Sequence, residues 1–97
     1  MTIEHDFFRP RHAPASVLYD AFQDEAKHRK GREVEEWIRL ELEAVHRAAC
    51  TYAGQHGLHA PSIEQVAAAE RYARGSADYG SKWALVLAEK MTPITRT

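Results

Sequence analysis

Hydrophobic residues recur at intervals of three and four over most of this chain, which is the spacing of an amphipathic helix. The clearest pattern covers residues 33–55. Its apolar positions form one stripe along the helix: Val34, Ile38, Leu42, Val45, Ala49 and Tyr52. Trp37 and Leu40 widen the apolar surface to one side of that stripe. The pattern predicts one long helix with a second surface that faces another helix or another chain.

Three shorter patterns predict three further helices. They cover about residues 16–28, 62–74 and 78–90. Ser16 is a candidate N-cap of the first, and Ser62 with Gln65 has the spacing of a capping box at the start of the second. The pair Gly75-Ser76 separates the last two. Because no segment alternates like a strand, the sequence predicts an all-α fold, a small helical bundle of one long and three short helices.

The chain divides into an irregular N-terminal arm, a single helical domain and a C-terminal tail. These parts are predicted for residues 1–14, 15–91 and 92–97. Pro10 and Pro14 disfavour a helix in the arm, and Pro93 bars one in the tail. Exposing both Phe7 and Phe8 would leave substantial apolar area in water, so we expect their rings to hold the arm against the domain or a partner.

The composition is that of a single globular domain without a strong electrostatic bias. The 97 residues are 44% hydrophobic and 28% charged, with a formal net charge of -1. These values argue against a disordered chain. They also supply no general attraction for nucleic acid or for an anionic membrane.

Cysteine usage and targeting signals bear on the compartment. Cys50 is the only cysteine, which excludes an internal disulfide and a thiolate-only metal site, and we expect a small buried thiol there. The start of the chain shows no signal-peptide pattern, and the longest apolar run, residues 83–88, is too short to span a membrane. We therefore expect a cytoplasmic protein with no membrane partner.

Two Glu-x-x-His sequences suggest a metal site: Glu25 with His28, and Glu43 with His46. This spacing puts a carboxylate and an imidazole on one side of a helix, as in carboxylate-bridged di-iron bundles. Such sites need both pairs to point inward, whereas Glu43 lies opposite the apolar stripe of its helix. We expect solvated surface side chains here, and no metal or other cofactor.

Four positions match the spacing of a helix-turn-helix. They are Ala53, Gly57, Ile63 and Val66. In that motif the second helix enters the major groove of DNA, and Gln65 and Arg71 are the candidate base-contacting residues. Glu64 and Glu70 would repel phosphate. The spacing also fits a plain helical corner, so both interpretations stay open.

Glu70 falls near the centre of the inner face of its predicted helix. A buried carboxylate must be paired or neutral, and Lys82 on the next helix or Arg74 one turn later is a suitable cation. We expect a structural ion pair between Glu70 and Lys82 that fixes the register of the last two helices. The alternative is a partly exposed Glu70 bridged to Arg74 at the surface.

Catalytic motifs do not occur in the chain. There is no Gly-rich phosphate loop, no His-Glu-x-x-His and no Gly-x-Ser-x-Gly sequence. A chain of this length also leaves little concave volume for a substrate. We therefore expect a protein that is not an enzyme.

The C-terminal third carries the pattern Val66-x-x-Ala69-Glu70-x-x-Ala73-x-Gly75-Ser76-x-Asp78-Tyr79-x-x-Lys82-Trp83-Ala84-Leu85. This segment resembles the C-terminal portion of small, mostly uncharacterised helical proteins encoded by tailed phages and prophages. The resemblance implies a phage setting and brings no assigned activity. Phage proteins of this size are often host-directed factors, including inhibitors of bacterial defence such as anti-CRISPR proteins, and some are transcriptional regulators. This chain lacks the strong acidity of DNA-mimicking inhibitors.

The leading hypothesis is a non-catalytic interaction protein that binds a host or phage macromolecule in the host cytosol, with inhibition of bacterial defence as one such role. Its candidate partner-binding residues are Phe7, Phe8, Arg9, Arg11, Trp37 and Leu40. A homo-oligomer through Trp37 and Leu40 is one form of this hypothesis. The alternative is a helix-turn-helix transcriptional regulator that binds DNA through Gln65 and Arg71.

Overall fold

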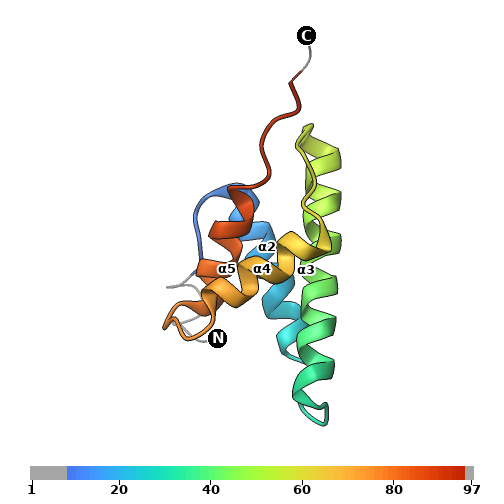
Figure 1. The fold of residues 1–97 in the computed structure, drawn as a ribbon, viewed down its shortest axis with the longest axis vertical. Helices are drawn as coiled ribbons and strands as arrows, with labels where there is room; N and C mark the ends of the chain where they lie inside the picture. The colour runs from blue at the N-terminus through green and yellow to red at the C-terminus, as the bar shows by residue number, and fades with distance from the viewer. Residues whose placement is uncertain (1–8, 96–97) are drawn as a thin grey trace.

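A computed structural model describes residues 9–95 and shows four helices joined by short connections (Figure 1). The helices α2, α3, α4 and α5 span Ala13–Ala26, Val34–His56, Ile63–Ala73 and Tyr79–Ala88. Within this part of the chain, β pairing is limited to an isolated bridge between Leu58 and Pro93. The predicted all-α bundle of one long and three short helices is confirmed.

The core lies where α2 packs against both α3 and α5, and where α4 packs against α3 and α5. Figure 1 shows α3 along one side of the domain and α4 crossing the other helices. The largest buried apolar side chains, each at most 1% exposed, come from all four helices: Leu18, Val45, Val66, Trp83 and Leu87. Burial of each contributes about 1.5–3 kcal/mol. The indole nitrogen of Trp83 donates a hydrogen bond to the carbonyl of Val66 at 3.1 Å, so its polar atom is satisfied.

The first helix begins earlier than the sequence predicts. It starts at Ala13 rather than Ser16, because Pro14 lies in the first turn, where a missing backbone N–H removes no helical hydrogen bond. His12 occupies the N-cap position without a side-chain cap, and the Ser16 hydroxyl donates to the carbonyl of Ala13 instead. The irregular arm therefore ends before Ala13.

The start of α4 has the capping box that the sequence predicts. The backbone N–H of Gln65 donates to the Ser62 hydroxyl at 3.1 Å, and the Ser62 N–H donates to the Gln65 side-chain oxygen at 2.9 Å. Before this connection, α3 ends at His56 and is capped by Gly57. The φ of Gly57 is 66°, a left-handed conformation that favours glycine. These local signals set the position of the α3–α4 connection.

The C-terminal segment contacts the α3–α4 connection. The N–H of His59 donates to the carbonyl of Thr92 at 2.8 Å, and the N–H of Ile94 donates to the carbonyl of Gly57 at 3.0 Å. Met91, directly before this segment, is buried. Figure 1 shows the segment beside the C-terminal end of α3. The described part of the predicted tail is therefore attached to the domain.

No helix among residues 9–95 combines the length and the apolar character that crossing a bilayer requires.

The helices α2 and α5 approach closely at Gly80. A Cβ atom at this position would lie 2.6 Å from Cε2 of Phe22 and 3.2 Å from Cε1 of Tyr19. The Phe22 ring is itself held edge to face against Tyr79 and Trp83, with ring centroids 5.6 and 5.4 Å away. The absence of a side chain at Gly80 is therefore what lets the two helices pack at this distance.

We predict that Gly80→Ala destabilises the protein. Overpacking a core costs about 1–3 kcal/mol, which exceeds the gain of up to about 1 kcal/mol when alanine replaces glycine in a helix. Gly54→Ala in α3 is the matched control, because nothing lies within 4 Å of an added Cβ there, and it should stabilise slightly. Urea unfolding followed by circular dichroism measures both. An equal gain from the two variants would contradict the close approach.

Candidate functional site

Glu41 is a buried carboxylate at the interface between α3 and the connection that follows α2. Its residue is 1% exposed, and both of its oxygens accept hydrogen bonds from Arg29. The distances are 2.6 Å from Nε to Oε2 and 2.9 Å from Nη2 to Oε1. These hydrogen bonds raise the pKa of Arg29 above its ordinary value. A buried carboxylate needs such a partner, because an unpaired charge in an apolar interior is costly.

Arg29 also stacks on aromatic rings. Its guanidinium carbon lies 3.9 Å from the centroid of the Trp37 ring and 5.7 Å from that of Phe22. Both distances are within the range of cation–π attraction. Trp37, a predicted partner-binding residue, is therefore half-buried and holds the Arg29 side chain against α3.

Glu70 is the second buried carboxylate, and its cation is Arg74. Nε of Arg74 lies 3.0 and 2.9 Å from the two carboxylate oxygens, and its Nη2 lies 2.8 Å from Oε1. The hydroxyl of Tyr79 donates a third hydrogen bond at 2.7 Å. Glu70 is 3% exposed, so the inward position is as predicted, and a partly exposed surface bridge does not describe it.

The predicted pairing of Glu70 with Lys82 is wrong. Arg74 follows Glu70 by one helical turn and reaches its carboxylate directly, whereas Lys82 lies on the outer side of α5. The ammonium nitrogen of Lys82 is 5.3 Å from the centroid of the Tyr72 ring instead. The register of α4 and α5 is therefore held by Tyr79, which reaches Glu70 from the next helix.

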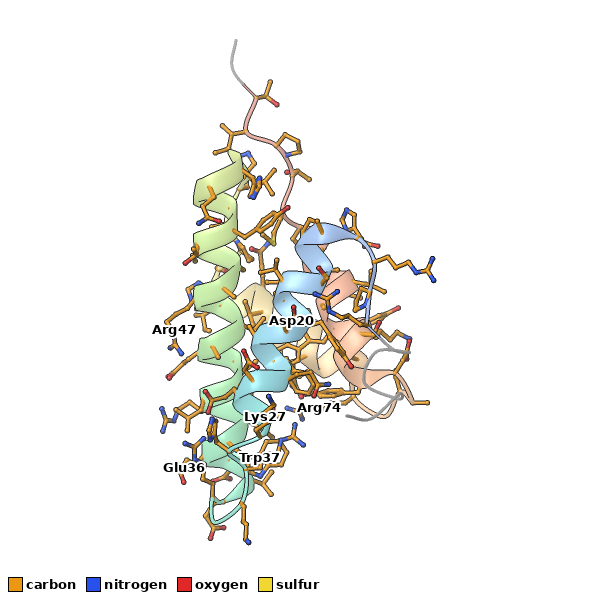
Figure 2. All side chains as sticks on the ribbon, turned by 180° about the vertical axis from the view of Figure 1, so that it is seen from behind. Asp20, Lys27, Glu36, Trp37, Arg47 and Arg74 are labelled. Carbon is orange, nitrogen blue, oxygen red and sulfur yellow. The ribbon has the colours of Figure 1, made fainter. Side chains whose placement is uncertain are left out.

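The two networks meet at a cleft of about 280 Å³ whose lining includes Arg29, Trp37, Arg74 and Tyr79. Figure 2 shows Trp37 and Arg74 on the same side of the molecule. Burial and the hydrogen bond to Glu70 raise the pKa of Tyr79 well above its ordinary value of 10.0. Its hydroxyl is therefore held as a neutral donor. Every buried side-chain nitrogen and oxygen atom within residues 9–95 has a hydrogen-bond partner. The polar side chains of the cleft are therefore held by contacts between the helices.

The two Glu-x-x-His sequences place their carboxylates in ion pairs. Glu25 accepts a hydrogen bond from Arg32 at 2.8 Å, and Glu43 lies 3.4 Å from Arg39. Over the described part of the chain, no three His, Cys, Asp or Glu side chains are grouped as metal ligands.

A groove between α4 and α5 is a surface feature that the sequence analysis did not single out. It measures about 590 Å³ and has a floor of Ala68, Ala69 and Val86. Tyr72 stands at its edge and is 66% exposed. The helical period could have identified Tyr72 as an exposed residue, because Tyr72 falls outside the inner face of α4 that Glu70 and its buried neighbours share.

The predicted partner-binding residues that the structure describes lie on different elements, Arg9 and Arg11 before α2 and Trp37 and Leu40 on α3. Phe7 and Phe8 lie outside the described residues. Arg9 makes a bidentate pair with Asp20 on α2, at 3.0 and 2.7 Å, while Arg11 is exposed. Leu40 is half-buried on α3.

The predicted DNA-contacting residues, Gln65 and Arg71, are both exposed on α4. The side-chain oxygen of Gln65 already accepts the Ser62 N–H, however. A bidentate contact with adenine would use the same side-chain oxygen, so the capping box competes with base recognition.

Comparison with protein-family models, curated proteins and solved structures finds no match to this chain.

We predict that Arg29→Ala destabilises the fold strongly. The substitution leaves the carboxylate of Glu41 buried without its cation, and breaking a buried pair in this way costs about 3–5 kcal/mol. Arg39→Ala is the control, because the Arg39–Glu43 pair is exposed, and exposed pairs contribute about 1 kcal/mol or less. Thermal and urea unfolding compare the two variants. Similar losses would show that the Arg29–Glu41 pair is not a structural requirement.

The raised pKa of Tyr79 makes stability depend on alkaline pH. In the unfolded chain the phenol ionises near pH 10.0, whereas in the folded chain it stays protonated at that pH. The folded state then binds more protons than the unfolded state. The stabilisation is therefore fully present below pH 10.0 and is lost as the pH rises toward the folded pKa.

Tyr79→Phe should consequently be less stable than the parent protein at neutral pH, by about 1.5–3 kcal/mol, because it removes a hydrogen bond to a charged group. This difference should shrink above pH 10.0. Urea unfolding at a series of pH values measures it, with Tyr72→Phe as the control that removes the hydroxyl of an exposed ring. A difference that stays constant with pH would contradict the role of Tyr79.

Proposed function

We propose that this chain is a non-catalytic interaction protein that binds another macromolecule through the groove between α4 and α5. The observation that carries the proposal is the exposure of Tyr72, whose ring is 66% exposed beside an apolar floor. Tyrosine is enriched among the residues that dominate binding energy, because it buries a large ring and keeps a polar end. No other large hydrophobic side chain among residues 9–95 is more exposed.

The distribution of polar groups supports the same proposal. The buried carboxylates Glu41 and Glu70 are occupied by Arg29 and Arg74. Lys82 makes no salt bridge within the described residues and lies on the groove. The interior is therefore occupied by fixed structural pairs, while the Tyr72 ring and the Lys82 ammonium group, which lies against it, line the groove.

The resemblance of residues 66–85 to phage-encoded proteins supports a partner in the bacterial cytosol, including a component of antiphage defence. Expression of the chain in a bacterium that carries a defence system tests this role. Plaque formation by a targeted phage should rise in the presence of the chain and should fall again with Tyr72→Ala. Unchanged plaque formation would exclude inhibition of that system.

DNA binding is retained as the alternative because α4 exposes Arg71 beside Gln65. An electrophoretic shift that disappears at high salt and with Arg71→Glu would support a regulator of the helix-turn-helix type.

We predict that Tyr72→Ala weakens binding to the partner at least tenfold without loss of helicity. A tenfold change in affinity corresponds to about 1.4 kcal/mol, and truncation of a hot-spot residue costs about 2 kcal/mol or more. Leu85→Ala is the control, because Leu85 is 40% exposed on α5 but is not part of the groove lining. The measurement is capture of the partner from host cytosol by the tagged chain, with and without nuclease.

Trp37→Ala distinguishes binding through the α4–α5 groove from binding through Trp37 and Leu40, as the sequence suggested. Its effect on binding should be smaller than that of Tyr72→Ala, since the Trp37 ring is covered by Arg29. A partner that is released by nuclease, or that depends on Trp37 and not on Tyr72, would contradict the proposed site.

A further inference from the structure

Three acidic side chains that make no salt bridge within residues 9–95 lie close together at the N-terminal end of α3. Glu33, Glu35 and Glu36 are all exposed there and have no ion-pair partner within residues 9–95. Val34 lies between them and is 58% exposed. Lys30 is the nearest free cation in the sequence, so the segment remains net acidic. This end of α3 presents an aliphatic side chain surrounded by carboxylates.

The groove between α4 and α5 has the complementary chemistry. Lys82 and Lys90 are both in its lining and make no salt bridge within the described residues. They are eight residues apart on and just after α5, which is about 12 Å along a helix. Val86, midway between them in sequence, and the exposed Tyr72 are also in the lining, with Glu89 as its single carboxylate. The groove is an apolar surface bounded by cations.

We propose that the N-terminal turn of α3 in one copy of this chain docks into the α4–α5 groove of a second copy. Val34 then covers the apolar part of the lining, and Glu33 and Glu35, on either side of Val34, approach Lys82 and Lys90. The contact joins exposed hydrophobic groups of both surfaces and pairs charges that make no salt bridge within residues 9–95 of one chain. This inference rests on the proposed function, because it assigns an occupant to the same groove.

The geometry makes this contact intermolecular. In Figure 1 the N-terminal end of α3 projects beyond α4 and α5 at the lower end of the molecule. Figure 2 places Glu36 at that end, on the side of α3 away from α2. One chain therefore does not fill its own groove. If each copy inserts its α3 end into the groove of the other, the pair closes into a two-fold dimer, whereas one-sided docking leaves one groove and one α3 end free and produces rings or open chains.

This arrangement differs from the homo-oligomer through Trp37 and Leu40 that the sequence suggested. One helical turn in a groove makes a small interface, and interfaces below about 1,200 Å² are weak and transient. Exposed charges add attraction that salt screens over about 10 Å at 0.1 M. Association should therefore depend on both protein concentration and ionic strength.

Two variants that each disable one surface test the proposal. Lys82→Glu with Lys90→Glu makes the groove acidic and leaves the α3 end intact. Val34→Ser with Glu33→Gln and Glu35→Gln removes the aliphatic side chain and the two flanking carboxylates of the α3 end and leaves the groove intact. We expect the average mass of the parent protein to rise with concentration in sedimentation equilibrium, and each variant alone to associate at least tenfold more weakly.

An equimolar mixture of the two variants is the decisive measurement. The intact α3 end of the first fits the intact groove of the second, so the mixture should form complexes that stop at two chains. Arg47→Glu, an exposed change on α3 outside both surfaces, should leave association unchanged. Circular dichroism checks that every variant keeps its helices.

A parent protein that stays monomeric at all concentrations overturns the proposal, as does association that survives both variants or is lost with Arg47→Glu. Capture of a different protein in a Tyr72-dependent manner by a monomeric chain would overturn only the second copy as occupant and leave the proposed function intact. Loss of both self-association and Tyr72-dependent capture would overturn the groove as a binding site.

Discussion

A single guanidinium group, that of Arg29, determines how the first two helices meet. The carboxylate of Glu41 is buried at their interface, and its hydrogen bonds to Arg29 offset a desolvation cost of several kcal/mol. The same group lies against Phe22, which contacts Tyr79 and Trp83 of α5. The position of α5 relative to α2 therefore depends in part on Arg29, which belongs to neither helix.

Pairing in the interior also determines which charges reach the surface. Because Arg74 and Tyr79 occupy the carboxylate of Glu70, Lys82 has no role inside the bundle and lies on the outer side of α5. Its ammonium group rests near the Tyr72 ring, where the cation and the aromatic face stabilise each other. The cation in the groove therefore follows from the way Glu70 is paired inside the bundle.

Helical periodicity and local capping were sufficient to predict the fold, whereas the ion pairs needed tertiary information. The Ser62 capping box follows from side chains three residues apart and was predicted correctly. Glu41 lies on the apolar stripe of α3, but nothing local connects it with Arg29, twelve residues earlier. Pro14 indicated an irregular arm, yet a proline is compatible with a first turn. Which distant side chains form an ion pair, and whether a helix end accepts a proline, depend on how the chain packs.

The two tryptophans of the chain sit in unlike surroundings, which gives the protein two built-in optical reporters. Trp83 is enclosed in the core and hydrogen-bonded to a backbone carbonyl, whereas Trp37 is half-buried with a guanidinium group over its ring. Local opening of the α2–α3 corner would change the fluorescence of Trp37 alone, while global unfolding would change both. Trp37 fluorescence therefore reports opening of the α2–α3 corner, and Trp83 fluorescence reports loss of the core.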